Sequence, residues 1–221
     1  MSERDDRVLA VMLKAPFPGR VKTRLASAYP AESVVALYKA LVEDTLDLAI
    51  SAGLRTVAVC PSGDEGELSR WLPPAVDVVP QRGSGLAAAL DSTFEQLCTS
   101  ERRRVIAFNA DSPHLPISRL ESAFAALTGA DVVIGPCDDG GYYLVGARQA
   151  HPGLFDSVAM GRASACDALH ARAADLGLRV ASIDAHYDVD VAADVVRLAG
   201  DLRADSRRAP RTAAVLAAWG V

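Results

Sequence analysis

Four basic side chains crowd into one short segment near the start of the chain. The segment, Lys14-Ala-Pro-Phe-Pro-Gly-Arg-Val-Lys-Thr-Arg24, follows an apolar run and contains two prolines and Gly19. Its cations are Lys14, Arg20, Lys22 and Arg24. A loop of fixed shape that offers several cations and free backbone N–H groups at a strand–helix junction suits a polyphosphate. The P-loop pattern GxxxxGK(S/T) is absent, and a solvated basic loop is the alternative interpretation.

A carboxylate follows the predicted strand Val105–Phe108. Asp111 stands in Asn109-Ala-Asp-Ser-Pro-His-Leu-Pro116, where Pro113 prevents the strand from continuing. A carboxylate at this point can hold Mg²⁺, which takes oxygen ligands and keeps waters and substrate phosphates in its shell. An Asx turn or a helix cap before Ile117 explains the same residues equally well.

A second acidic stretch, Asp184-Ala-His-Tyr-Asp-Val-Asp190, lies late in the chain. If it is extended, its period of two places Asp184, His186, Asp188 and Asp190 on one face. Carboxylates that share a face repel one another unless a cation lies between them, so the pattern predicts a cation site. The competing interpretation makes Asp190 a helix N-cap, with Asp194 in the first turn. A single histidine such as His186 is more often structural than a ligand.

Two glycine-containing segments follow predicted strands. In Gly135-Pro-Cys-Asp-Asp-Gly-Gly-Tyr-Tyr143, the stretch Asp139–Gly141 predicts a tight turn that lets a ligand approach the backbone. A plain hairpin turn is the alternative. The segment Gln81-Arg-Gly-Ser-Gly85 resembles part of a dinucleotide-binding fingerprint, but it follows the third predicted strand instead of the first, which argues against NAD.

Short β-rich runs alternate with helical patterns along the chain, which predicts an α/β fold. The predicted strands are Val8–Leu13, Thr56–Cys60, Val76–Pro80, Val105–Phe108, Val132–Ile134, Tyr142–Val145 and Val180–Tyr187. The predicted helices are Ala31–Ala52, Glu65–Leu72, Leu86–Leu97, Leu120–Leu127 and Ala165–Leu176, with Gly53 ending the first. Ligands of an open parallel sheet bind beyond the carboxyl ends of its strands, where the polar segments lie.

Composition narrows the class of protein. The length of 221 residues predicts one domain over residues 1–221, and the net charge of −5 with a pI near 5.4 disfavours a nucleic-acid polymer or an anionic membrane as partner. The chain contains no apolar run of the roughly 18 residues that span a bilayer. The polar start and the short apolar run Val8–Leu13 do not fit a signal peptide. The four cysteines form no CxxC pair, so we expect reduced thiols in a cytoplasmic protein.

In this order, the segments resemble a bacterial glycosyltransferase-like family whose members carry the motif K-x-P-x-P-G-x-x-K-T-R-L. Lys14 to Leu25 matches that motif throughout, and Asp111–Pro116, Gly135–Tyr142 and Asp188–Asp190 match later blocks. The match extends from about Val8 to Leu198. The family is similar to the phospholactate guanylyltransferases and the molybdenum-cofactor nucleotidyltransferases. The resemblance implies the GT-A fold of nucleotide-diphospho-sugar transferases, a Rossmann-like, mostly parallel sheet flanked by helices.

The resemblance also implies roles for individual residues. The basic loop is expected to bind the phosphates through Lys14, Gly19, Arg20, Lys22 and Arg24. The nucleobase is expected to contact Gln81, Gly83 and Gly85. Asp111, Asp188 and Asp190 are expected to bind Mg²⁺ or Mn²⁺. The residues expected to bind the acceptor are Asp139, Gly140, Gly141, Tyr142 and Ser164. Lys22 and Asp111 take the catalytic roles. Two departures leave the base and the acceptor open: Leu86-Ala-Ala-Ala89 replaces Leu-Gly-x-Arg, and Met160-Gly-Arg-Ala-Ser164 replaces a Trp-Gly-Thr-Ser-like stretch.

These observations predict a single nucleotide-binding transferase domain. The first hypothesis is a Mg²⁺-dependent nucleotidyltransferase that moves a nucleoside monophosphate from a triphosphate to a small phosphorylated or carboxylated metabolite, because the cations suit a triphosphate and its pyrophosphate. The alternatives are a nucleotide-sugar-dependent glycosyltransferase, with Asp138 or Asp139 as base, and a non-catalytic nucleotide-binding module. The sequence leaves open whether the protein forms a homodimer.

Overall fold

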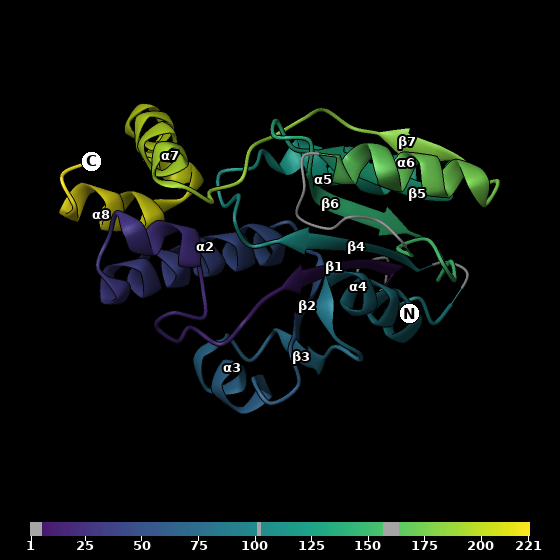
Figure 1. Ribbon diagram of the computed structural model, residues 1–221, viewed down its shortest axis with the longest axis horizontal. Helices are drawn as coiled ribbons and strands as arrows, with labels where there is room; N and C mark the ends of the chain where they lie inside the picture. The colour runs from purple at the N-terminus through teal and green to yellow at the C-terminus, as the bar shows by residue number, and fades with distance from the viewer. Residues whose placement is uncertain (1–5, 101–102, 157–163) are drawn as a thin grey trace.

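A mixed sheet forms the centre of the computed structural model, which describes residues 6–100, 103–156 and 164–221. In this part of the chain seven strands pair in the order β3-β2-β1-β4-β6-β5-β7 (Figure 1). β6 runs antiparallel to β4 and β5, and the other pairs are parallel. The strands are β1 (Arg7–Met12), β2 (Arg55–Cys60), β3 (Asp77–Pro80), β4 (Arg104–Asn109), β5 (Val132–Pro136), β6 (Tyr142–Ala147) and β7 (Val180–Ser182). The predicted Rossmann-like, mostly parallel sheet is confirmed.

Helices cover both faces of this sheet (Figure 1). The helices are α2 (Ala31–Ser51), α3 (Glu65–Trp71), α4 (Gly85–Leu97), α5 (Ile117–Ala126), α6 (Ala165–Asp175), α7 (Ala192–Ala204) and α8 (Pro210–Ala218), with short 3-10 turns η1 (Thr23–Ser27) and η2 (Ser206–Arg208). Leu9 and Val11 of β1 join the core under α2, α3 and α5, whereas Val8 and Ala10 join the core under α4 and α6. A strand covered on both faces must be apolar at every position, which explains the uninterrupted run in the sequence.

The end of α2 follows the predicted stop. Gly53 adopts φ +69, and its N–H donates to the carbonyl of Ile50 while that of Leu54 donates to the carbonyl of Ala49. This pair of bonds satisfies carbonyls that the helix end would leave unpaired, and glycine reaches the required left-handed conformation at little cost.

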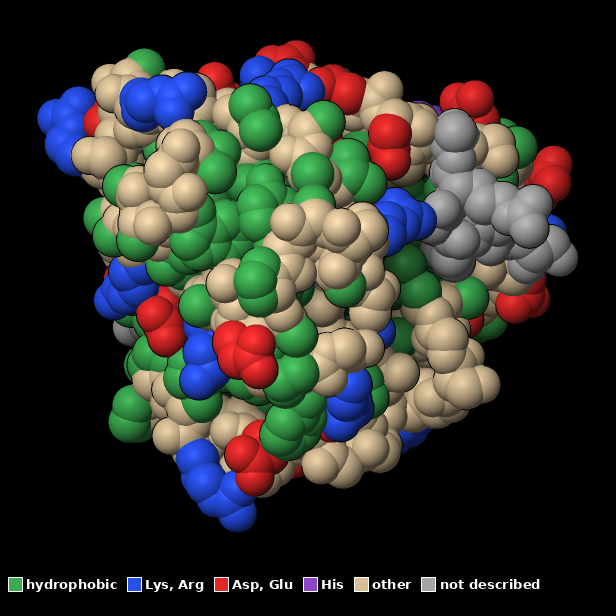
Figure 2. Space-filling model, turned by 60° about the vertical axis from the view of Figure 1, so that its left-hand side comes forward, with side chains coloured by type: hydrophobic (Ala, Val, Ile, Leu, Met, Phe, Trp, Pro, Cys, Tyr) green, Lys and Arg blue, Asp and Glu red, His purple; other side chains and the backbone are tan. Residues whose placement is uncertain are grey.

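The C-terminal helices form a third layer. α7 and α8 pack against α2 around a separate core that includes Leu37, Leu41, Leu198 and Leu216. On the face shown in Figure 2, basic and acidic side chains are interspersed, so this face offers no patch of a single sign. Among the helices of the described residues, none has both the length and the apolar character that a membrane span requires.

Two predictions about the late acidic stretch are wrong. β7 ends at Ser182, so the predicted strand Val180–Tyr187 stops early, and Asp184, His186, Asp188 and Asp190 do not share one face of a strand. An isolated bridge between His186 and Cys137, which follows β5, is one of the links between this stretch and the sheet. Asp190 is not the cap of α7 either, because the N-cap is Val191 and the Asp194 carboxylate accepts the N–H groups of Asp190 and Val191. The carboxylate of Asp190 is therefore available for other partners.

Candidate active site at the carboxyl edge of the sheet

A cavity of about 570 Å³ opens beyond the carboxyl ends of β1, β2 and β4. Its walls bring together residues from four segments that the sequence analysis singled out. They include Lys14, Arg20, Lys22 and Arg24 from the loop after β1, Gln81 before α4 and Gly85 at its start, and Asp111 and Asp190. The volume lies within the range of ordinary small-molecule sites, and the position is the one at which open α/β sheets bind ligands.

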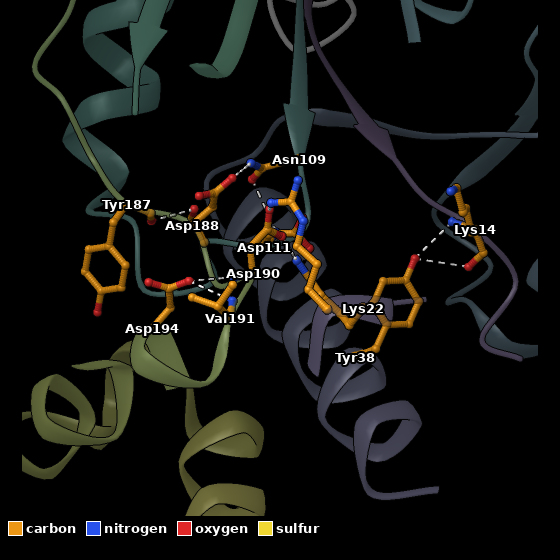
Figure 3. Close-up of polar contacts among 12 residues, drawn as sticks. Lys14, Lys22, Tyr38, Asn109, Asp111, Tyr187, Asp188, Asp190, Val191 and Asp194 are labelled. Carbon is orange, nitrogen blue, oxygen red and sulfur yellow. Dashed lines mark hydrogen bonds and ion pairs between the residues drawn. The ribbon is translucent and has the colours of Figure 1, made fainter. Parts of the chain in front are cut away.

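The basic loop is held in shape by two residues that the sequence analysis did not select. The buried carboxylate of Asp64 accepts the N–H of Ala15 at 2.8 Å and a guanidinium N–H of Arg20 at 2.9 Å. The hydroxyl of Tyr38 accepts the N–H of Lys14 at 2.9 Å and donates to its carbonyl at 3.1 Å (Figure 3). Burial raises the pKa of Tyr38 and so keeps it a neutral donor. The loop is therefore built before any ligand arrives.

Lys22 lies between two carboxylates at the base of the cavity. Its Nζ is 2.7 Å from Oδ2 of Asp111 and 2.9 Å from Oδ1 of Asp190, and its side chain is 5% exposed (Figure 3). Burial lowers the pKa of Lys22, but the two carboxylates outweigh burial, so its pKa is raised and the ammonium stays charged. Arg24 holds the second oxygen of Asp190 at 3.0 Å.

Asp188 lies beside this group without a cation of its own. Its carboxylate accepts a long hydrogen bond of 3.4 Å from the amide of Asn109, and within the described ranges no Lys, Arg or His forms an ion pair with it. Burial raises its pKa to about 6, and the neighbouring carboxylates of Asp190 and Asp111 add to the rise. By contrast, although burial opposes it, Lys22 and Arg24 lower the pKa of Asp190.

Backbone contacts join the two acidic segments, which lie far apart in the sequence. The N–H of Val189 donates to the carbonyl of Asp111 at 3.1 Å. The hydroxyl of Ser112, which is fully buried, donates to the carbonyl of Tyr187 at 2.9 Å. Proper placement of Asp111 against Asp188 and Asp190 thus depends on bonds that residue type alone does not reveal.

The carboxylates fit a hard divalent cation in their chemistry. Three carboxylates face two cations, so one negative charge is uncompensated, and the oxygen ligands suit Mg²⁺ or Mn²⁺. Among the residues that the structure describes, however, no group of three His, Cys, Asp or Glu side chains is arranged to hold a metal. Asp111, Asp188 and Asp190 could therefore share a metal only with water, or with oxygens of a bound ligand, completing its shell.

The residues predicted to bind the acceptor form a neighbouring group outside the cavity walls. Gly141 N–H donates to the Asp139 carboxylate at 2.9 Å, and the carbonyl of Gly140 accepts the N–H of Cys166 at the start of α6. Ser164 precedes this helix and is exposed. Tyr142 is partly buried, and Asp139 is close enough to contribute to the raised pKa of Asp188. Met160 to Ala163, where the sequence departs from the motif, lie outside the described residues.

Several candidates have other places. Gly19 and Gly83 do not line the cavity. Gly83 has φ +75, and a Cβ at this position would clash with that of Ala88, so the backbone conformation and packing account for a glycine there. Asp184 pairs with Arg119. The ring of His186 packs 4.5 Å from that of His114. All four cysteines are free thiols, as predicted, and three are buried.

Comparisons with known proteins agree with this geometry. Residues 45–162, more than half of the chain, match the family described as "uncharacterized protein conserved in bacteria (DUF2064)". The chain belongs to this family. A search of the curated proteins found no match. The more specific resemblance to phospholactate guanylyltransferases and molybdenum-cofactor nucleotidyltransferases stays a prediction.

Solved structures share the fold of this DUF2064 protein. One, from Desulfovibrio desulfuricans G20, is provisionally described as a nucleotide-diphospho-sugar transferase; it has a TM-score of 0.88 and 27% identity over 96% of this chain and 94% of its own. The inositol-1-phosphate CTP transferase from T. maritima has a TM-score of 0.57 and 17% identity, over 85% and 91%. Rv0371c from Mycobacterium tuberculosis H37Rv, in complex with manganese, has a TM-score of 0.51 and 17% identity, over 87% and 97%. The fold is thus shared with nucleotidyltransferases and nucleotide-diphospho-sugar transferases.

Proposed function

We propose that this protein is a nucleotidyltransferase that depends on Mg²⁺ or Mn²⁺. It transfers a nucleoside monophosphate from a triphosphate to a small phosphorylated or carboxylated metabolite. The observation that carries the proposal is the meeting of four loop cations with Asp111 and Asp190 at one cavity, with Asp188 beside the two aspartates. The cations offer charge for a triphosphate, and the aspartates offer oxygen ligands for its metal.

Each part of the cavity has a task in this reaction. The loop cations Lys14, Arg20, Lys22 and Arg24 hold the phosphates, and Gln81 with Gly85 lines the side open to the base. A metal held by Asp111, Asp188 and Asp190 would supply further positive charge to the phosphate oxygens. The acceptor enters beside Asp139, Gly140, Gly141, Tyr142 and Ser164. A phosphate or carboxylate acceptor is already ionised at neutral pH and needs no general base.

The fold neighbours support the same reaction class. One of them is named as a CTP transferase, and another is seen with manganese. These proteins are under 25% identical to this chain, so they support the fold, and the residues of the cavity carry the rest.

A glycosyltransferase acting on a nucleotide-sugar is the second candidate. The neighbour from Desulfovibrio desulfuricans G20, at a TM-score of 0.88, favours it by its provisional description. Here Asp139 would be the better base, because Asp138 is paired with Arg197 at 3.0 Å. The two reactions differ in their product, since nucleotidyl transfer releases pyrophosphate and glycosyl transfer releases a nucleoside diphosphate.

Thermal unfolding with a panel of ligands tests these functions. Each nucleoside triphosphate and nucleotide-sugar is added with and without Mg²⁺, and a ligand at about 100 times its Kd should raise the Tm by roughly 5–10 °C. Asp111→Asn should lose the metal-dependent shift, whereas Asp184→Asn, a carboxylate placed elsewhere, should keep it.

Product analysis with the ligand that shifts the Tm then decides the reaction. Pyrophosphate release in the presence of a phosphorylated or carboxylated acceptor supports nucleotidyl transfer, and release of a nucleoside diphosphate supports glycosyl transfer. Binding without either product across a broad acceptor panel supports a non-catalytic module. A panel in which no nucleotide shifts the Tm contradicts the proposal.

A further inference from the structure

The ammonium of Lys22 lies between two of the carboxylates whose oxygens could serve as metal ligands. It lies 2.7 Å from Asp111 and 2.9 Å from Asp190, and the side chain is 5% exposed. Lys22 has φ +45, and no other non-glycine residue in the described ranges has a positive φ. This left-handed conformation is sterically unfavourable for a residue with a Cβ such as lysine. The loop therefore directs this one side chain toward the carboxylates at some cost to its backbone.

The balance of charge shows that the arrangement is incomplete. Asp111, Asp188 and Asp190 carry three negative charges, and Lys22 and Arg24 carry two positive ones. A divalent ion added beside Lys22 would leave one positive charge in excess and would find one oxygen of Asp111 and both of Asp190 already engaged. A divalent ion that replaced Lys22 would bring the cluster to neutrality and free an oxygen of Asp111 and one of Asp190.

We propose that Lys22 is a resident counter-ion that gives way to a divalent metal and turns its charge into the cavity. The inference deepens the proposed function, because the released ammonium would then face the phosphates. Lys22 already lines the cavity, and its four-carbon stem can move the charge without moving the backbone. Arg24 keeps its own oxygen of Asp190 in both states.

The choice of lysine fits an exchange better than a fixed ion pair. The chain contains 20 arginines and three lysines, so most of its basic positions carry arginine and position 22 is one of the few that carry lysine. Arginine binds carboxylates through a rigid fork of donors, whereas an ammonium is a compact charge with rotatable donors. A counter-ion that must be released is better served by the ammonium.

The small number of lysines gives a direct test on the wild-type protein. Labelling lysine with ¹³C at Cε produces three NMR signals, from Lys14, Lys22 and Lys39. The signal that is missing in K22M is that of Lys22. Lys39 lies 5.5 Å from the ring of Trp71 and serves as an internal control. Titration with Mg²⁺ alone, without nucleotide, should move the Lys22 signal toward that of a solvated lysine and leave the Lys39 signal in place. Calorimetry on the same sample reports metal binding. Bound Mg²⁺ with an unmoved Lys22 signal would overturn the exchange.

Metal affinity of two variants separates exchange from simple charge repulsion. Mn²⁺ binding followed by electron paramagnetic resonance should tighten at least about tenfold in K22M, because the competitor for two oxygens is gone. R24M removes the positive charge that pairs with the same Asp190. Because the Arg24 side chain is 60% exposed and its charge is screened by solvent, R24M should tighten Mn²⁺ binding by less than about threefold. Circular dichroism confirms the fold of each variant, and K22Q repeats the test if K22M unfolds. Equal gains in the two variants, weaker binding by K22M, or no binding of Mn²⁺ to any of them would overturn the proposal.

These tests do not depend on the proposed function, since they use metal without nucleotide. If the Lys22 signal moves and no nucleotide is turned over, the exchange stands and the reaction is wrong. If pyrophosphate is released while the Lys22 signal stays fixed under Mg²⁺, the reaction stands and the exchange is wrong.

Discussion

Asp64 should contribute more to stability than any exposed ion pair of similar geometry. Its carboxylate, 5% exposed, accepts hydrogen bonds from Ala15 and Arg20 at 2.8 and 2.9 Å. In Asp64→Asn the amide oxygen can still accept the N–H of Ala15, but the amide NH₂ cannot accept from Arg20. Loss of a buried charge-assisted bond costs roughly 1.5–3 kcal/mol. For a chain of this length each kcal/mol lowers the Tm by about 2–4 °C, so the Tm should fall by roughly 3–12 °C.

The pair between Arg55 and Asp77 provides a matched control. Its N–O distance is also 2.9 Å, but the Asp77 side chain is 58% exposed. Exposed pairs contribute at most about 1 kcal/mol, so Asp77→Asn should change the Tm far less than Asp64→Asn. Urea unfolding of both variants with calorimetry supplies the free energies. Equal losses would refute the reasoning that burial makes the Asp64 bonds strong. We also expect Asp64→Asn to weaken binding of inorganic tripolyphosphate, since the basic loop loses its anchor.

Three further changes test the site and its surroundings. Asp111→Asn should lower the rate of product release by about 10²–10⁴, measured in the steady state, because it removes a charged ligand from the reaction centre; unchanged turnover would remove Asp111 from the mechanism. Asp188 has a folded-state pKa of about 6, above the ordinary value of about 3.9, so this group destabilises the fold as pH rises through that window. In metal-free buffer at pH 7.5, the free energy of unfolding of Asp188→Asn should therefore exceed that of wild type by about 1–3 kcal/mol. Thermal scans should show this gain vanishing near pH 4, and a gain that grows at low pH would contradict the reasoning. Gly83→Ala combines φ +75 with a Cβ 2.8 Å from that of Ala88 and should cost about 1–3 kcal/mol in urea unfolding, more than Gly63→Ala, where φ is +97 and the space is open.

The sheet was predictable because burial on both faces leaves a strong signal. Apolar runs such as Val8–Leu13 and Val105–Phe108 are typical of strands buried on both faces, and the observed β1 and β4 differ from them by one residue at each end. α2 and its end at Gly53 were predictable for a similar reason, because the apolar stripe and the glycine are local features of the sequence. Because the polar segments follow these strands, their meeting at one edge of the sheet was also predictable.

The partners within the site were not predictable from local pattern. Lys22 and Asp190 are 168 residues apart, and their contact depends on the path of the whole chain between them. The alternation predicted a strand over Val180–Tyr187, but β7 ends at Ser182, and the N–H of Val189 in the segment that follows donates to the carbonyl of Asp111. Asp64 gave no signal beyond being an aspartate after a strand, although a search for carboxylates at strand ends would have included it.

The incomplete neutralisation of the carboxylates is itself evidence about function. A buried carboxylate without a cation costs stability, and Asp188 is held against Asp111 and Asp190, whose charges make its own ionisation harder. Asparagine at position 188 would keep the size of the side chain and remove that cost. Asp131, by contrast, is closely paired, through bidentate hydrogen bonds from Arg179. A chain with 20 arginines has the means to neutralise one more carboxylate. That it leaves the charge open at the edge of a cavity lined by cations argues that the missing charge arrives with the ligand.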